Sequence, residues 1–293
     1  MDNRNDIREF LTTRRARISP QQAGLPDYGG HRRVPGLRRG EVAMLAGVSP
    51  EYYTRLEQGK LAGVSESILH SLAEALQLDD AEQSHLFDLA RTAGSTPRPR
   101  RRPKQQIPPS LQYALDAITG VPAFVRNGRL DILATNVLGQ ALYSAMYTDE
   151  SRPVNIARFV FLNRRAVDFY PDWIRAASDT VAVLRAESGR DPYNKELSEL
   201  VGELSTRSEE FRTRWAAHNV RRHTTGHKHF HHPVVGDIEL MFNALEHTAD
   251  PGLTLLLYSA EPGSAAEDAL RLLGSLAATP DQAGHPETAD ATE

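Results

Sequence analysis

The residues with the clearest potential for chemistry are histidines that gather near residue 230. The stretch 223–236 reads HTTGHKHFHHPVVG, and five histidines lie within ten residues: His223, His227, His229, His231 and His232. If residues 227–231 form a strand, alternate histidines share one face of it. The spacing His-x-His-x-His can bind zinc, copper or nickel when further ligands converge on the same point. Asp237 and Glu239 follow closely enough to supply them from a pairing strand.

Three interpretations of these histidines stay open. A metal site usually needs ligands from a second element and supporting hydrogen bonds, so we prefer a solvated strand face for His227, His229 and His231. The alternative is a metal- or heme-responsive sensor that uses the cluster His227–His232. A metal-dependent hydrolase is the third interpretation. His232 would point to the opposite face, toward either the core or a bound ligand.

Few other residues suggest catalysis. The sequence lacks cysteine, a G-x-S-x-G motif, an H-E-x-x-H motif and a Gly-rich phosphate loop. Without cysteine, disulfides, iron–sulfur clusters and Cys-type zinc sites are excluded. We therefore expect no enzymatic activity, no catalytic residues and no cofactor.

A second group of side chains has the pattern of a contact with DNA. Residues 38–60 read RRGEVAMLAGVSPEYYTRLEQGK. Gly47 suits a tight turn with positive φ between two short helices. Ser49 is a favourable N-cap and Pro50 a favourable first helical residue. The pattern predicts a helix-turn-helix, whose second helix, about 50–58, would lie in the major groove.

The side chains of this second helix divide into two faces. Tyr53 and Leu56, three residues apart, would face the core. The positions predicted to face DNA are Ser49, Glu51, Tyr52, Thr54, Arg55 and Gln58. Arg55 suits a bidentate contact to guanine. Arg38 and Arg39, at the start of the preceding helix, would contact phosphate.

The distribution of charge agrees with a polyanionic partner for the first third of the chain. Residues 1–110 carry 17 Lys and Arg against 13 Asp and Glu, whereas residues 111–293 carry 17 against 25. We expect a helix-turn-helix domain of five helices at 1–93 and a basic Pro/Arg-rich linker at 94–110. A second domain would span 111–277, and an acidic disordered tail 278–293.

The pattern after the linker is mixed. Residues 121–136 read as strand, Asn127-Gly128 turn and strand. Helical segments follow at 136–146, 155–161, 172–188, 194–205 and 208–218, then two or three strands with a turn at 233–236, and a final helix. We therefore expect a multidomain chain in which an α+β domain with one antiparallel sheet follows the helices. The chain has no signal-like start and no run long enough to span a membrane, so we expect a cytoplasmic, nucleoid-associated protein without a membrane partner.

The quoted motifs resemble a known family. Residues 1–92 resemble the XRE-type helix-turn-helix domain, and the wording VPGLRRGEVAMLAGVSPEYYTRLEQGK resembles the MmyB-like bacterial transcription regulators. The segments LDILATN, FLNRRAVDFYPDW, HPVVGDIELMFNAL and LLLYSAEPGS are similar to the ligand-binding domain of that family. The resemblance covers about residues 6–277. It implies a PAS-like second domain and a regulator whose affinity for DNA responds to a small apolar or acyl-chain-like ligand, such as a fatty acid.

Several residues are candidates for the ligand pocket of such a domain, which would lie between its sheet and its helices. We expect contacts from Asn136, Tyr143, Phe161, Trp173, Trp215, Arg222 and His232. A wider set adds Phe124, Leu133, Leu142 and Phe242. Each aromatic residue has ordinary core packing as its alternative, and Asn136 has the alternative of capping the next helix. The expected partners are double-stranded operator DNA, a small-molecule ligand and a second copy of the chain in a homodimer.

Overall fold

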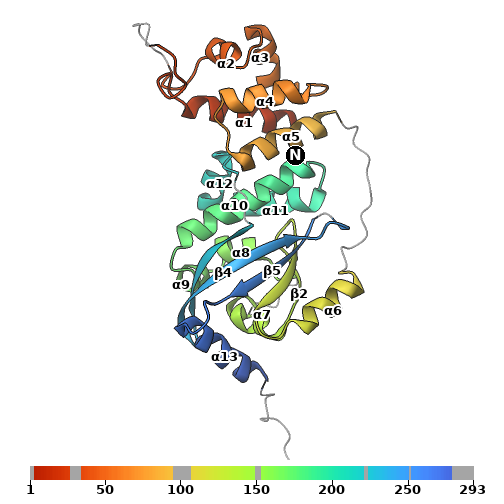
Figure 1. Ribbon diagram of the computed structural model, residues 1–293, viewed down its shortest axis with the longest axis vertical. Coiled ribbons are helices and arrows are strands. Elements are labelled where there is room, and N and C mark those ends of the chain that lie inside the picture. The colour runs from red at the N-terminus through yellow and green to blue at the C-terminus, as the bar shows by residue number, and fades with distance from the viewer. Residues whose placement is uncertain are drawn as a thin grey trace, which may run out of the picture.

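The computed structural model describes residues 3–26, 34–94, 107–148, 153–220, 224–250 and 252–278. An N-terminal group of five helices lies on a larger unit of helices and strands (Figure 1). The predicted fold class, a helical helix-turn-helix region followed by an α+β domain with an antiparallel sheet, is confirmed. Most of the predicted linker, residues 95–106, and nearly all of the predicted tail, residues 279–293, lie outside the described residues.

Five helices make up the N-terminal group: α1 (Asn3–Arg17), α2 (Arg39–Leu45), α3 (Pro50–Glu57), α4 (Glu66–Ala75) and α5 (Asp80–Ala93). Their starts follow local capping rules. The Asp79 carboxylate accepts hydrogen bonds from the backbone of Ala81 and Glu82 at 2.9 Å, so the predicted capping box of α5 forms. Ile7, Phe10 and Leu11 of α1 are fully buried among these helices, as their helical spacing predicts.

The second unit is organised around one five-stranded sheet. Its strands are β1 (Ala123–Asn127), β2 (Ile132–Thr135), β3 (Thr225–His232), β4 (Gly236–Glu246) and β5 (Leu253–Ser259). The order is β2-β1-β5-β4-β3, and every neighbouring pair is antiparallel. Because β5 lies between β1 and β4, the last strand joins two hairpins that are about a hundred residues apart in the sequence.

The predicted Asn127-Gly128 two-residue turn is wrong in detail. The hairpin of β1 and β2 forms, but its connection is wider, and Leu130 rather than Gly128 adopts a positive φ of 67°. The Asn127 side chain accepts hydrogen bonds from the backbone of Arg129 and Asp131, at 3.0 and 2.9 Å. This Asx-type bonding stabilises a longer loop that the dipeptide alone does not indicate.

Eight further α-helices are described: α6 (Pro109–Ala117), α7 (Val137–Leu142), α8 (Ile156–Leu162), α9 (Arg165–Phe169), α10 (Trp173–Arg190), α11 (Lys195–Arg207), α12 (Glu209–Ala216) and α13 (Ala265–Ala278). The sequence did not predict α6 and α9. Helix α6 begins inside the predicted linker, and its Leu115 packs on Val125 and Leu253 at the outer face of the sheet.

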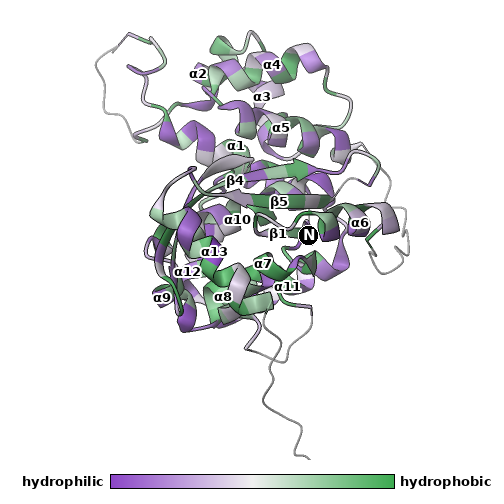
Figure 2. Cartoon of the chain, turned by 60° about the horizontal axis from the view of Figure 1, so that its bottom comes forward, coloured by the Kyte–Doolittle hydropathy of each residue, from purple (hydrophilic) through white to green (hydrophobic). Residues whose placement is uncertain are grey.

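The inner face of the sheet carries the main core. Helices α7 to α13 pack apolar side chains against it. Phe124, Phe230 and Tyr258 of the strands and Tyr143 at the end of α7 belong to this core. Figure 2 shows hydrophobic residues on α7 and the strands, and hydrophilic residues along much of α1. None of the described helices combines the length and the hydrophobicity that crossing a membrane requires.

Candidate nucleic-acid interface and ligand cavities

Helices α2 and α3 form the predicted helix-turn-helix. Gly47 between them has a φ of +65°, and the Ser49 hydroxyl accepts a hydrogen bond from the backbone of Tyr52 at 3.1 Å. Gly59 follows α3 with a φ of +88°. A Cβ at Gly59 would lie 2.5 Å from the carbonyl oxygen of Arg4, so this position cannot carry a side chain without a shift of α1.

The outer face of α3 is polar and open. Figure 1 shows α2 and α3 at the end of the molecule that lies away from the sheet. Tyr52 and Thr54 are half-buried, and the Thr54 hydroxyl donates to the carbonyl of Pro50 at 2.8 Å. Exposed side chains are those of Arg38, Ser49, Glu51, Arg55 and Gln58. Arg55 has no side-chain hydrogen bond or ion pair within the described residues, so its guanidinium has all its donors for another molecule.

A buried carboxylate fixes the inner side of the same helix. Glu57 is 2% exposed and accepts hydrogen bonds from Arg15 at 2.9 and 3.2 Å, from Arg39 at 3.2 Å and from Thr12 at 3.1 Å. Burial alone would raise the pKa of Glu57, but the bonds from Arg15 and Arg39 outweigh it and lower the pKa. Glu57 is not among the residues predicted from the sequence, although its spacing of four from Tyr53 puts it on the inner face.

Arg39 therefore has a structural contact besides its predicted role at phosphate. Its side chain is 56% exposed, and its guanidinium bridges α2 to Glu57 in α3. Arg38, one residue earlier, is exposed at the start of α2. Of the two arginines, Arg38 is the one whose substitution would remove a positive charge from this surface without breaking the bridge between α2 and α3.

Buried arginines join the helical group to the second unit. Arg14 in α1 is 2% exposed, pairs with Glu82 at 2.8 Å and donates to the carbonyl oxygen of His218. Arg185 in α10 pairs with Asp6 at 3.3 Å, and its guanidinium lies 3.6 Å from the centre of the Trp215 ring. These contacts fix α1 against α10 and the end of α12 by charge and stacking rather than by apolar surface alone.

Helices α5 and α10 approach each other closely beside these arginines. A Cβ on Gly189 would lie 2.5 Å from Nδ1 of His85, so the absence of a side chain at Gly189 allows His85 to pack directly on α10. His85 is 3% exposed and meets Phe10 edge-on. Burial first, and then the positive fields of Arg185 and Arg14, lower the pKa of His85 to about 3, so the ring is neutral near pH 7.

A cavity of about 360 Å³ lies between α5, α10 and one end of the sheet. Its size is within the range of small-molecule sites, and its place at a junction between two units is typical of them. Helix α5 contributes Ser84, His85 and Asp88, and the sheet contributes Arg126, Glu246 and Thr254. Apolar walls come from Ala81, Val183, Ala186, Val220 and Ala244.

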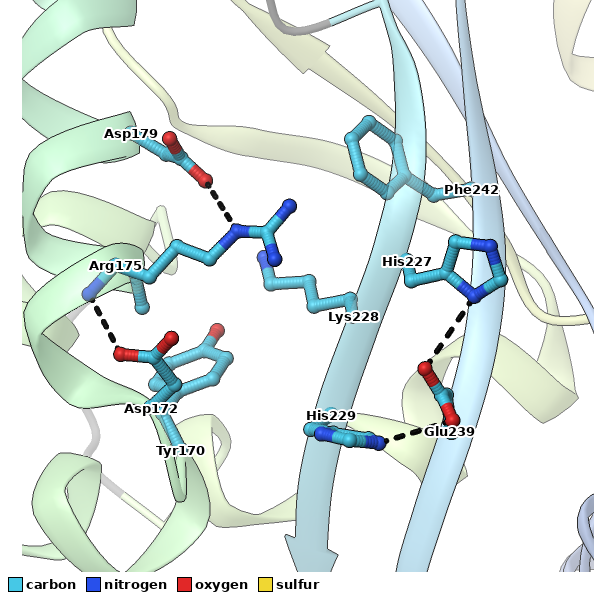
Figure 3. Close-up of a pocket in the computed structure, with 10 residues that line it drawn as sticks. Tyr170, Asp172, Arg175, Asp179, His227, Lys228, His229, Glu239 and Phe242 are labelled. Carbon is cyan, nitrogen blue, oxygen red and sulfur yellow. Dashed lines mark hydrogen bonds and ion pairs between the residues drawn. The ribbon is translucent and has the colours of Figure 1, made fainter.

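A smaller cavity of about 110 Å³ lies between α10 and the edge of the sheet. Figure 3 shows Lys228 reaching from β3 toward α10, where Arg175 lies between Asp172 and Asp179. The ammonium of Lys228 lies 5.1 Å from the centre of the Tyr170 ring. Burial lowers the pKa of Lys228 to about 8. The volume of this cavity is well below that of an ordinary ligand site.

The three alternate histidines share one face of β3, as predicted. His227 and His229 flank Glu239 at 3.3 and 3.1 Å (Figure 3), and His231 lies 2.6 Å from Asp237. Their side chains are more than half exposed. Over the part of the chain that the structure describes, no three His, Asp or Glu side chains converge as metal ligands would. His223 lies outside the described residues.

Asn136 and His232, two polar candidates for ligand contact, make hydrogen bonds within the fold. The Asn136 side chain accepts from Gly139 at 2.7 Å, which caps α7, and donates to the carbonyls of Ile118 and Val121. His232 is 2% exposed; Nε2 contacts the carbonyl of Ala141 at 3.0 Å and Nδ1 accepts from the backbone of Val234 at 3.2 Å. Neither residue lines either cavity.

The aromatic candidates pack in or against the core. The Tyr143 hydroxyl is 2.6 Å from that of Tyr258, and the Trp173 indole donates to the carbonyl of Val160 at 2.9 Å. Phe161 and Trp215 both contact Phe211. Neither cavity is lined by these residues, nor by Phe124, Leu133 or Leu142 of the wider set, whereas Phe242 lines the smaller one. Arg222 lies outside the described residues. Arg126, which the sequence analysis did not name, lines the larger cavity.

Two family models match the chain. Residues 107–273 match the MmyB-like transcription regulator ligand binding domain, and residues 8–86 match a helix-turn-helix domain. The first match covers the sheet and the helices around it, and the second covers α2 and α3 with most of their neighbours. A comparison with curated proteins gave no match.

Proposed function

The chain belongs to the MmyB-like transcription regulators, in which a DNA-binding helix-turn-helix accompanies a ligand-binding domain, and from this we propose that a small ligand changes its affinity for an operator. The observation that carries the proposal is the outer face of α3. Arg55 and Gln58 are exposed there, at the end of the molecule opposite to the side that contacts the second unit. A helix with this placement can enter the major groove without disturbing the interface between the units.

We assign the contacts with DNA to the residues that the sequence singles out. Arg55 reads a guanine, while Tyr52 and Thr54 meet thymine methyls or phosphate, and Ser49, Glu51 and Gln58 complete the surface. Arg38 contacts phosphate, and Arg39 supports the same surface through Glu57. A homodimer would place two α3 helices about 34 Å apart, which predicts a roughly palindromic operator.

The ligand-binding unit has a PAS-like fold in this proposal, and its ligand is small and at least partly apolar, as a short acyl chain is. The domain limits that we propose are 1–93 for the first domain and 111–277 for the second, with α6 beginning two residues before the latter. A regulator of this kind acts in the cytoplasm on the nucleoid. No reaction is part of the proposed function.

An electrophoretic mobility shift tests the proposal. Full-length protein is titrated with DNA from the region upstream of its own gene and with a shuffled duplex of the same composition. We expect the protein to bind the upstream DNA more tightly than the shuffled duplex. We also expect the logarithm of the binding constant to fall linearly with the logarithm of the salt concentration, with a slope of about −0.9 for each phosphate contact. The proposed function is wrong if no sequence-dependent, salt-sensitive shift occurs.

A further inference from the structure

We propose that the cavity between α5, α10 and the sheet binds a small organic monocarboxylate through Arg126, so that the ligand contacts both units of the chain. The proposal rests on the function proposed above and names the site and the chemical class of its ligand. It places the ligand next to the helix-turn-helix unit, whereas the sequence led us to expect it among the aromatic residues of the second domain.

Arg126 carries a buried charge that the described residues leave almost without partners. The side chain is 6% exposed, lies on the inner face of β1 and lines the cavity. Within the described residues its guanidinium makes one hydrogen bond, from Nη1 to the carbonyl oxygen of Asn127 at 3.3 Å, and no ion pair. Burial lowers its pKa to about 10, so the group is still charged at neutral pH. A buried charge without a counter-ion is costly, and an anion in the cavity would compensate it.

The other charges of the cavity limit the charge of the ligand. Arg190 pairs with Glu246 at 2.9 Å and approaches Asp88 at 3.9 Å. The Glu187 side chain packs over Gly128. Glu187 and Glu246 both favour the charged state of Arg126, although neither is close enough to form an ion pair with it. A dianion such as phosphate would meet the fields of three carboxylates. One carboxylate matches the planar guanidinium in a bidentate way and adds only one negative charge.

The apolar part of the wall argues for an organic body behind the carboxylate. Alanine and valine side chains from α5, α10 and β4 surround the space, beside the hydroxyls of Ser84 and Thr254. Since α5 belongs to the helix-turn-helix unit and the strands to the other, a ligand that contacts both stabilises their docked arrangement. Binding at this site therefore acts on the orientation of α3 relative to the second unit.

Three probes with one ring and different charges test the site: benzoate, benzamide and benzylamine. Binding to the full-length protein is measured by calorimetry and, for weak binding, by ligand-observed NMR. We expect benzoate to bind at least tenfold more tightly than either of the others. Bound benzoate should also slow amide hydrogen exchange in both α5 and α10. Equal binding of benzoate and benzamide, or protection confined to one unit, would overturn the proposal.

Substitutions at the site separate a ligand role from a structural one. Arg126→Gln should weaken benzoate binding at least tenfold without lowering the unfolding temperature of the ligand-free protein, because it removes an uncompensated charge. Arg158→Gln removes an arginine that pairs with Glu203 outside the cavity and should leave benzoate binding unchanged. Retained binding in Arg126→Gln, or a lower unfolding temperature, would show that Arg126 has another role.

A second variant keeps the test decisive if Arg126→Gln does not fold. Ala244→Leu fills part of the cavity and leaves Arg126 in place, so it should weaken benzoate binding at least tenfold. Unchanged binding to this variant contradicts the proposed position of the ligand. The operator shift is measured on the same preparation: a shift without benzoate binding rejects this site alone, and benzoate binding without a shift rejects the regulatory function alone.

Discussion

Glu57 in α3 and Arg126 in β1 are both charged and both almost fully enclosed, but their surroundings are opposite in kind. Glu57 receives hydrogen bonds from two arginines and a threonine, so its charge is compensated within the chain. Arg126 has one backbone carbonyl as its hydrogen-bond partner among the described residues. A compensated buried charge holds elements together, whereas an uncompensated one beside a cavity indicates a missing partner.

The two regions also expose different surfaces to other molecules. Around Glu57 the inner side of α3 is closed, and the binding groups, such as Arg55, lie on the outside. Around Arg126 the binding group is inside, and the outside of β1 is covered by α6. The first region therefore suits a large, rigid partner that lies against the surface, and the second suits a molecule small enough to enter.

The largest effect that we predict comes from breaking the compensated charge. Glu57→Gln removes the countercharge of two arginines, and we expect the free energy of unfolding to fall by about 3 kcal/mol, at the low end for a buried ion pair because Arg39 is half exposed. Far-UV circular dichroism during urea unfolding measures the change. Both tryptophans lie in the second unit, so their fluorescence should respond less.

Glu51 provides the control on the same helix. It is exposed on the outer face of α3, and Glu51→Gln should change the free energy of unfolding by no more than about 0.5 kcal/mol. If both variants lose the same free energy of unfolding, the hydrogen bonds that Glu57 receives do not stabilise the fold. The contrast between a compensated and an uncompensated buried charge would then be wrong.

The second prediction concerns specificity for DNA. The wild-type protein should prefer the operator over a duplex in which the contacted guanine is replaced. Arg55→Ala should reduce this difference in binding free energy by about 2 kcal/mol, because a bidentate contact is lost. Arg38→Ala should weaken binding to both duplexes alike and reduce the salt slope by about 1. Fluorescence anisotropy at two salt concentrations measures both. If Arg55→Ala weakens all sequences equally, Arg55 contacts phosphate and not a base.

The region around α3 could be predicted from the sequence because its determinants are local. Gly47, Ser49, Pro50 and Gly59 lie within thirteen residues and specify a turn, a cap, a start and a stop through rules that act over a few positions. Glu57, on the same helix, was not predicted. Its spacing from Tyr53 indicates the inner face, but its partner Arg15 lies on another helix, and no local rule connects the two.

The larger cavity could not be predicted in the same way. Its lining runs from Ala81 to Thr254 and exists only because α5 docks on α10 and β5 enters the middle of the sheet. The expectation that Asn136 and His232 contact a ligand relied on residue type, and both side chains satisfy neighbouring backbone groups. One local signal was present: in β1, Arg126 follows three apolar residues and lies two positions after Phe124, on the same face of the strand.

The third prediction uses a buried ring at the junction of the two regions. His85 has a folded-state pKa of about 3 against an ordinary value of 6.5, so the unfolded chain takes up a proton first as the pH falls. The contribution of His85 to the free energy of unfolding is therefore fully present above pH 6.5. Below pH 6.5 the free energy of unfolding falls by up to about 1.4 kcal/mol per pH unit. His218, with a pKa lowered to about 4 by burial, contributes in the same direction.

Urea unfolding at several pH values between about 6.5 and 5 measures this loss, above the range in which most carboxylates titrate. His85→Gln removes the titrating ring and should flatten the profile relative to the unsubstituted protein. His70→Gln is the matched control, because His70 is exposed on α4. An equally steep profile in His85→Gln would mean that His85 is already protonated in the folded protein.

The smallest effect should come from the histidines on the outer face of β3. In the triple variant His227→Ala, His229→Ala and His231→Ala, we expect the free energy of unfolding to fall by less than about 1 kcal/mol. The three side chains are more than half exposed, and exposed polar contacts of this kind contribute little to stability. Metal analysis of untagged protein should find less than one equivalent, and the operator shift should be unchanged. One equivalent of metal that disappears in the triple variant would move the sensing site from the inner side of the sheet to its outer face, and the contrast between Glu57 and Arg126 would no longer identify where the ligand binds.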